Sequence, residues 1–384
     1  MSGSDDLAFD DWVSRAREVP LDRAADMVGA KLRRSGPEMI GPCPACGGTD
    51  RFSINPKKHV WNCRGARGGD DAIGLVIHCQ DIEFLPACEL LTGESPPGRD
   101  SRPPDPAVVR ERREERREAE RQREEEIHEE RRRKMNGAAD LFEKAGPFFG
   151  SHAEAYMRRR HLVLSSEQAC DLRFMPSLPY LGFTDKHAEE QEKLGEYPAM
   201  IAAIRNAAGE IIGVHRTYLD PVEPKKLVPP GDRTRNAAKK MYGNANGMIR
   251  LGPIMPYMAV GEGIETSLAW WQLGIGPEEC GVAAAGSLGN LSGASLDTMP
   301  HPKVRGRTIQ NGVPDPQRPG LVMPVGVKGV ILLGDGDSEP FATRAHLLTG
   351  GRKFQAAGLE VLVTIAPDGK DFSDVYSEQQ RDAA

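Results

Sequence analysis

Acidic residues that follow apolar segments are the strongest candidates for chemistry in this sequence. Glu262 follows one such segment, Asp335 and Asp337 follow a second, and Asp368 and Asp371 follow a third. The carboxyl ends of parallel strands form the ligand crevice of an open α/β sheet. Acids gathered there repel one another unless a cation neutralises them, and Mg²⁺ prefers oxygen ligands. One acid after a strand is usually a turn residue or a helix cap, but three sets together favour a divalent metal site.

Three cysteines form a second candidate site. Cys43 and Cys46 are two residues apart, so both sulfurs can reach one tetrahedral ion, and Cys63 follows after sixteen residues. Thiolates suit zinc, so this spacing predicts a zinc ribbon. A second Cys-x2-Cys pair that began at Cys63 would place the fourth cysteine at position 66, but this residue is Ala66. The alternatives for the fourth ligand are His59, His78, Cys79 and Asp70, and the cysteines could instead be small buried residues without a metal.

Basic and aromatic residues surround these cysteines. They are Arg51, Lys57, Lys58, Arg64 and Arg67, with Phe52 and Trp61 among them. Aromatic rings among positive charges are typical of a surface that binds single-stranded nucleic acid. The same composition also fits a solvated surface with two core aromatics.

Composition limits the class of protein. The chain has 384 residues, 39% of them hydrophobic, and 50 basic against 56 acidic residues, for a formal charge of −6. This balance excludes a uniformly basic, histone-like binder, although nucleic acid remains a candidate substrate because binding depends on where charge clusters. No apolar run approaches the ~18–20 residues of a membrane span. The acidic start MSGSDDLAFDDW is unlike a signal peptide, so we expect a cytoplasmic protein with no membrane partner.

The sequence before residue 140 predicts two short helices, a zinc ribbon and a charged segment. Apolar residues at helical spacing predict two short helices within 7–34, broken near Pro20, and the segment 41–94 holds the predicted zinc ribbon. From Arg110 to Lys134, 21 of 25 residues are charged, with both signs at helical spacing. This segment could bind nucleic acid, but its balanced charge favours a solvated spacer helix.

The C-terminal third predicts an α/β fold. Continuous apolar segments at 257–261, 281–285, 329–333 and 359–365 alternate with helical patterns at 265–273 and 343–357. Buried, mainly parallel sheets have this pattern. Residues 299–324, rich in Pro, Gly and Arg, interrupt it as a loop insertion. Before it, residues 199–204 and 211–215 predict two strands separated by a turn.

The acidic motifs resemble the Toprim domain, a catalytic module of bacterial-type primases, topoisomerases and certain nucleases. The matching features are Glu262-Gly263, the Asp335-x-Asp337 motif, the segment 367–371 and the small-residue turn Gly286-Ser287. Residues 43–52, 61–65 and 68–73 resemble the zinc-binding domain of bacterial and phage primases. Segments 213–220 and 239–243 resemble the basic half of the primase catalytic core. The chain as a whole resembles a prophage or plasmid Toprim primase.

This resemblance implies a DNA primase that makes short RNA primers on single-stranded DNA from ribonucleoside triphosphates. Glu262, Asp335 and Asp337 would hold Mg²⁺ (or Mn²⁺), and Asp368 and Asp371 would assist them. The residues expected to contact nucleic acid or nucleotide phosphates are Arg216, Lys239, Lys240 and Lys370. No Gly-x4-Gly-Lys-Ser/Thr motif occurs, so we expect a replicative helicase to act in trans.

The resemblance also divides the chain and leaves rival functions open. The expected parts are 1–95 (helices and zinc ribbon), 96–136 (charged linker), 137–254 (basic half of the core) and 255–384 (Toprim). The sequence departs from the pattern at Ala66 and at Glu265-Thr266, a variant associated with mobile-element primases. A topoisomerase is disfavoured because the chain lacks room for a gate domain. A Toprim nuclease and a non-catalytic protein that binds single-stranded DNA stay as alternatives.

Overall fold

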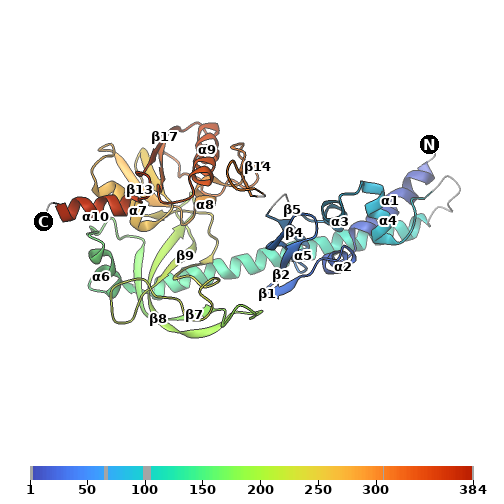
Figure 1. The fold of residues 1–384 in the computed structure, drawn as a ribbon, viewed down its shortest axis with the longest axis horizontal. Coiled ribbons are helices and arrows are strands. Elements are labelled where there is room, and N and C mark those ends of the chain that lie inside the picture. The colour runs from blue at the N-terminus through green and yellow to red at the C-terminus, as the bar shows by residue number, and fades with distance from the viewer. Residues whose placement is uncertain (1–2, 65–67, 98–104, 306, 383–384) are drawn as a thin grey trace. The chain divides into compact units, whose positions relative to one another are not determined.

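The chain forms two compact units in a computed structural model that describes residues 3–64, 68–97, 105–305 and 307–382 (Figure 1). Unit 1 comprises Met1–Glu130, His187–Gln191 and Gly306–Thr308. Unit 2 comprises Arg131–Lys186, Glu192–Arg305 and Ile309–Ala384. Ala66 and Arg67 lie outside the described residues. Within the described part of the chain, every helix is too short or too polar to cross a membrane.

Unit 1 combines four short helices with an antiparallel sheet. Pro20 precedes the second helix as its N-cap, which confirms the predicted break between the first two helices. The helices are α1 (Gly3–Arg17), α2 (Leu21–Met27), α3 (Ala72–Gln80) and α4 (Phe84–Thr92). The strands, in spatial order, are β1 (Arg33–Ser35), β2 (Glu38–Cys43), β3 (Gly47–Asn55), β4 (Val60–Cys63) and β5 (Gly68–Gly69).

The aromatic residues near the cysteines belong to the core of unit 1. Phe52 and Trp61 are 0% and 4% exposed. The indole N–H of Trp61 donates to the carbonyl of Asp71 at 3.1 Å, and its ring stacks on His78 with centroids 5.4 Å apart. These two rings therefore cannot stack on nucleic-acid bases, and the alternative of two core aromatics is confirmed.

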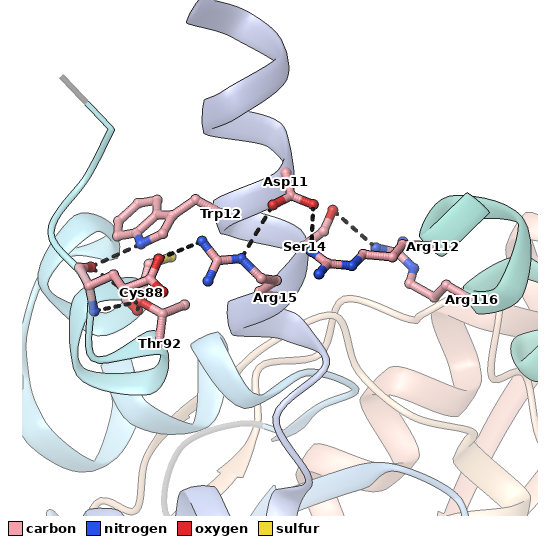
Figure 2. A network of polar contacts seen from close by, with 9 residues as sticks. Asp11, Trp12, Ser14, Arg15, Cys88, Thr92, Arg112 and Arg116 are labelled. Carbon is pink, nitrogen blue, oxygen red and sulfur yellow. Dashed lines mark hydrogen bonds and ion pairs between the residues drawn. The ribbon is translucent and has the colours of Figure 1, made fainter. Parts of the chain in front are cut away.

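The charged segment is helical, as predicted, but it is attached to its surroundings. It lies within α5 (Pro106–Lys144), the long turquoise helix of Figure 1. Figure 2 shows Arg112 and Arg116 of α5 reaching α1. The Arg112 guanidinium lies 3.5 Å from Asp11 Oδ1, and Arg116 donates to Ser14 Oγ at 3.5 Å. Near the other end of α5, Ala138 and Phe142 are buried in unit 2. No residue of 110–134 is buried, so the predicted solvated helix is confirmed for this segment, and α5 becomes buried only beyond it.

Unit 2 begins with the end of α5 and also contains helix α6 (His152–Arg159) and a five-stranded antiparallel sheet. Ala199–Ile204 is continuously buried, so the sheet packs on both faces. The two strands predicted in this region are present and are longer than predicted. In spatial order the strands are β10 (Lys239–Gly243), β9 (Ile211–Tyr218), β8 (Glu192–Arg205), β7 (Leu172–Gly182) and β6 (Gly146–Pro147).

The C-terminal part of unit 2 has the predicted α/β alternation. Strand β12 pairs in parallel with β13 and β16, β16 pairs in parallel with β17, and β11 is antiparallel to β13. The strands are β11 (Ile249–Arg250), β12 (Tyr257–Gly261), β13 (Cys280–Ala284), β16 (Gly329–Gly334) and β17 (Glu360–Ile365). The helices are α7 (Ile264–Gln272), α8 (Leu288–Ser292), α9 (Pro340–Ala356) and α10 (Phe372–Asp382). The insertion contains two short paired strands, β14 (Thr298–Pro300) and β15 (Thr308–Gln310).

The two sheets of unit 2 share one hydrophobic core. Met200 and Ile204 of the antiparallel sheet pack in the same buried cluster as Ala259 of β12 and Leu268 of α7. Asp171, which is fully buried, is paired with Arg205 at 2.8 Å and Arg250 at 2.7 Å. Two guanidinium groups satisfy this carboxylate, which a buried charge requires. Residues on either side of 254 are therefore packed into one body.

Candidate functional site

Four of the five predicted catalytic acids line one cavity of unit 2. Glu262 follows β12, Asp335 and Asp337 follow β16, and Asp371 follows β17. The cavity has a volume of about 250 Å³, and Lys239 of β10 lines it as well. Because β12, β16 and β17 run in parallel, their carboxyl ends lie at one edge of the sheet. The parallel order thus brings together acids that are more than 100 positions apart in sequence.

Backbone contacts between two loops hold these acids in place. The N–H of Gly336 donates to the carbonyl of Lys370 at 2.9 Å, and the N–H of Gly369 donates back to the carbonyl of Gly336 at 2.9 Å. A Cβ atom at Gly336 would collide with the carbonyl of Pro367, so the residue between Asp335 and Asp337 must be glycine. Glycine at this point therefore ties the loop after β16 to the loop after β17.

The acids raise one another's proton affinity. Burial, together with the charges of Asp371, Glu262 and Asp337, raises the pKa of Asp335 to about 7. Burial also raises the pKa of Glu262 and of Asp371. Like charges that are partly removed from water favour protonation or a bound cation. The cavity is therefore a place where a cation would relieve a strong repulsion.

The donor set fits a hard divalent cation. Oδ1 of Asp335 is buried and has no hydrogen-bond partner among the described residues. Such an atom usually has a ligand, ion or water as partner. Carboxylate oxygens from Glu262, Asp335 and Asp337 are the ligands that Mg²⁺ takes. Asp371 has a second role, because its Oδ1 accepts the N–H of Asp374 at 2.7 Å and caps α10.

Four other predicted residues do not line the cavity. Asp368 is exposed in the loop after β17, and Lys370 pairs with Glu378 of α10 at 2.6 Å. Lys240 lies opposite Arg216 in the β10–β9 register, where its ammonium group lies 4.3 Å from the centroid of the Tyr180 ring. Arg216 donates to the carbonyl of Met241 at 3.1 Å. Of the two neighbouring lysines, only Lys239 lines the cavity, because successive residues of a strand point to opposite faces.

Sequence reasoning missed a second set of residues at the cavity. Its centre is Glu265 in the first turn of α7, which is 4% exposed. Lys226, Arg160 and His215 also line the cavity. Burial, followed by the charge of Lys239, lowers the pKa of His215 to about 4, so this imidazole is neutral at neutral pH. Glu265 was visible as the second acid of its motif, but no spacing rule connects it to Lys226 or Arg160.

The three cysteines and His78 form a compact group in unit 1. Their ligand atoms all lie within 4.8 Å of one another, and no other group of this kind occurs in the described residues. His78 Nε2 lies 3.3 Å from Cys43 Sγ and 3.8 Å from Cys46 Sγ. Cys43 ends β2, Cys63 ends β4, and His78 lies near the end of α3. Three thiols and one imidazole are a donor set that zinc takes in structural sites.

The structure separates His78 from the other candidates for the fourth ligand. His59 is directed to the carbonyl of Asp70, with its Nδ1 at 3.0 Å, and Asp70 is exposed. Cys79 is buried beside the group, and burial with the charges of Cys43 and Cys63 raises its pKa to about 12. Cys79 does not belong to the group of four residues whose ligand atoms lie within 4.8 Å of one another. His78 is thus the side chain that completes a four-ligand group with the cysteines.

Comparison with protein families gives a match for the middle of the chain. Residues 132–250 match a family described as "Domain of unknown function (DUF7146)". No curated protein matches the sequence.

The chain is similar to several solved primase structures. The Aquifex aeolicus primase, comprising zinc-binding and RNA polymerase domains, is 16% identical over 100% of this chain and 85% of that chain, with a TM-score of 0.33. A DnaG primase catalytic domain bound to ssDNA is 15% identical over 66% of this chain and 77% of that chain, with a TM-score of 0.37. The RNA polymerase domain of Mycobacterium tuberculosis primase DnaG is 17% identical over 65% and 80%, with a TM-score of 0.32.

Proposed function

We propose that this protein is a Toprim-type DNA primase that makes short RNA primers on single-stranded DNA for a phage, prophage or plasmid. The observation that carries the proposal is the cavity where Glu262, Asp335, Asp337 and Asp371 meet Lys239. Acids at the ends of parallel strands, facing a basic group, suit nucleotidyl transfer, in which negative charge develops on phosphate oxygens.

In the reaction, the 3′-hydroxyl of one nucleotide attacks the α-phosphorus of a second nucleoside triphosphate. A new P–O bond forms, pyrophosphate leaves, and the hydroxyl proton passes to water. Glu262, Asp335 and Asp337 would hold Mg²⁺ or Mn²⁺, which orients the triphosphate and offsets charge on the attacking and leaving oxygens. Asp371 lies in the same cavity and would orient water at these ligands. Lys239 would bind phosphate oxygens as a point charge.

Other predicted residues take supporting roles in this proposal. Arg216 and Lys240 are neighbours across β9 and β10 and would contact template phosphates away from the cavity. In the loop after β17, Asp368 would assist the metal ligands and Lys370 would contact nucleic-acid or nucleotide phosphates. The Cys43, Cys46, Cys63 and His78 group would hold zinc and keep the β2–β4 sheet folded against α3. A replicative helicase would act in trans.

The proposal is tested by incubating the protein with single-stranded DNA, ribonucleotides and Mg²⁺. Short RNA products are expected from the wild type, and at least ~100-fold less product from Asp337→Asn. Asp382→Asn is the matched control, because this acid is exposed at the end of α10, lies outside the cavity and has no role in the proposal. DNA nicking without RNA products would indicate the nuclease instead. DNA binding with no product of either kind would indicate the non-catalytic alternative.

A further inference from the structure

The sheets of this protein differ in how their edge strands are protected. An edge strand presents unpaired backbone groups, so natural proteins shorten it or place charged residues or Pro on it, which prevents pairing with another chain. Within the part of the chain that the structure describes, five of the six edge strands of the three larger sheets follow this rule. Strands β5, β6 and β11 have two residues each, β1 begins with two arginines, and β10 begins with two lysines. The sixth edge strand, β17, does not follow it.

Strand β17 is a regular edge with almost no charge. It has six residues and pairs with β16 without a bulge. Its only charged residue, Glu360, is the first, and the segment 361–366 contains neither a charge nor a proline. Leu362, Val363 and Ile365 are 64%, 49% and 42% exposed. Parallel sheets are normally covered on both faces, so three exposed aliphatic side chains on one strand indicate a surface that lacks its cover.

The backbone of β17 offers hydrogen bonds on its free side. The N–H groups of Glu360 and Ala366 each donate to a carbonyl on the β16 side at 2.9 Å. Successive residues of a strand present their backbone groups to opposite sides. The N–H and C=O groups of Val361, Val363 and Ile365 therefore point away from β16, and no strand of the described residues pairs with them. The free side of β17 is thus suited to an extended strand.

We propose that β17 pairs with β17 of a second copy of this chain, in antiparallel orientation about a two-fold axis at Val363. In this register, Val363 lies opposite its own counterpart, and Val361 lies opposite Ile365 of the second copy. All three are β-branched and share one face of the strand, and cross-strand pairs of this kind stabilise antiparallel sheets. Each outward N–H and C=O of these residues then has a partner. The inference does not depend on the proposed function.

A second copy fits this edge for reasons of charge and closure. The pairing brings no like charges together on the strands, since Glu360 lies opposite Ala366 of the second copy. Because both copies use the same strand, a two-fold dimer leaves no free β17 edge on which further chains could add. At the other edge of the sheet, the two-residue strand β11 is too short to extend the pairing.

The size of the contact sets its expected strength. Each partner of a standard interface buries ~800 Å², and one strand of six residues is small against that area. We therefore expect a weak dimer, with a Kd of about 1–100 µM.

The experiment is sedimentation equilibrium of the full chain over a range of concentrations. The wild type is expected to show a monomer–dimer equilibrium. Val363→Lys should weaken dimerisation at least ~10-fold, because two ammonium groups would meet at the two-fold axis. Val325→Lys is the matched control, because this valine is fully exposed in the loop before β16 and should leave the dimer unchanged.

Val363→Pro tests whether backbone hydrogen bonds hold the two copies together. Proline lacks the N–H, and at this position the N–H faces away from β16, so the sheet itself should survive. Dimerisation should weaken by about 10-fold or more, because one hydrogen bond from each copy is lost. Melting temperatures check that the variants remain folded.

Cross-linking provides a measure that does not depend on the folding of these variants. A short bismaleimide is expected to join two copies of Val363→Cys, because the two side chains are neighbours at the axis. Val325→Cys and the wild type are the controls and should not be joined. Absence of the cross-link in Val363→Cys would overturn the inference.

Three sedimentation results would also overturn it. A wild type that stays monomeric at every concentration would leave the edge to a strand of another protein. A dimer that is unaffected by Val363→Lys would place the contact elsewhere on the molecule. A dimer that Val363→Lys disrupts and Val363→Pro leaves intact would indicate packing of side chains without pairing of strands.

Discussion

The two candidate metal sites are built in opposite ways. In unit 1, the ligand atoms of three cysteines and His78 lie within 4.8 Å of one another, so together they would enclose a single ion. In unit 2, the acids line a cavity of about 250 Å³ and do not form a group that compact. A structural zinc site closes around its ion, whereas a catalytic site must leave room for substrate. The comparison indicates a site that serves folding in unit 1 and a site that serves chemistry in unit 2.

The first test of this comparison is Asp335→Asn, for which we expect the largest effect. Primer synthesis should fall at least ~100-fold, because the variant loses one carboxylate ligand while keeping the shape of the side chain. Folding should survive, since the native charge at this position is opposed by burial and by three neighbouring acids. Initial rates and melting temperatures measure the two effects. Unimpaired synthesis would contradict the assignment of this cavity as the active site.

The second test concerns the closed site. His78→Asn should lower zinc affinity at least ~100-fold, because it removes a direct ligand, whereas loss of a supporting contact typically costs 10- to 100-fold. Cys79→Ala should keep one zinc per chain, because Cys79 is outside the four-residue group. Elemental analysis and competition with a chelator measure both. Zinc loss in Cys79→Ala with retention in His78→Asn would show that the fourth ligand is Cys79.

Sequence patterns predicted the features that follow from the order of residues along the chain, namely the acids at the strand ends and the cysteine cluster. The alternation of apolar strands and helices after residue 255 placed Glu262, Asp335 and Asp337 at strand ends, and the structure brings them to one cavity. Local spacing likewise predicted the three cysteines. Both signals are short-range or follow from the parallel order of strands.

Contacts between distant side chains could not be predicted in this way. Glu265 meets Tyr156 across 109 positions and Lys226 across 39, and no periodicity connects them. The identity of the fourth ligand at the cysteine site could not be predicted for the same reason. It depends on which face of α3 packs against β2 and β4. Lys239 and Lys240 differ in the structure only because a strand alternates its faces, and sequence alone does not give which face is inward.

The third test uses pH, to which the two sites should respond in opposite directions. In metal-free protein, the raised pKa of Asp335, about 7, means that the folded state binds more protons than the unfolded state between about pH 4 and pH 7. The contribution of this group to stability is therefore lost as pH rises through that window. The stability difference between the wild type and Asp335→Asn should thus shift in favour of the variant on going from pH 5 to pH 8.

At the zinc site, acid should weaken binding, because thiolates and imidazole must be deprotonated to bind the ion. Denaturation at fixed pH values, with a chelator present or absent, separates the two responses. Added Mg²⁺ should reduce the difference at Asp335 and leave zinc retention unchanged. A stability difference that does not change between pH 5 and pH 8 would contradict the electrostatic description of the cavity.

The smallest expected effect concerns the attachment of α5 to α1 in unit 1. Arg112→Ala removes the ion pair with Asp11, whose side chain is 10% exposed while that of Arg112 is 50% exposed. Exposed pairs contribute little, so we expect a loss of about 0.5 kcal/mol in the stability of unit 1. Arg113→Ala, at an exposed neighbouring position, is the control. Amide hydrogen exchange should quicken in α1 and the first turns of α5, while zinc content and primer synthesis stay unchanged. The cysteine site depends on packing within unit 1, whereas the acid-lined cavity does not. Faster amide exchange at the ends of β12 and β16 in Arg112→Ala would therefore show that the two sites are coupled. The contrast drawn between them would then be too simple.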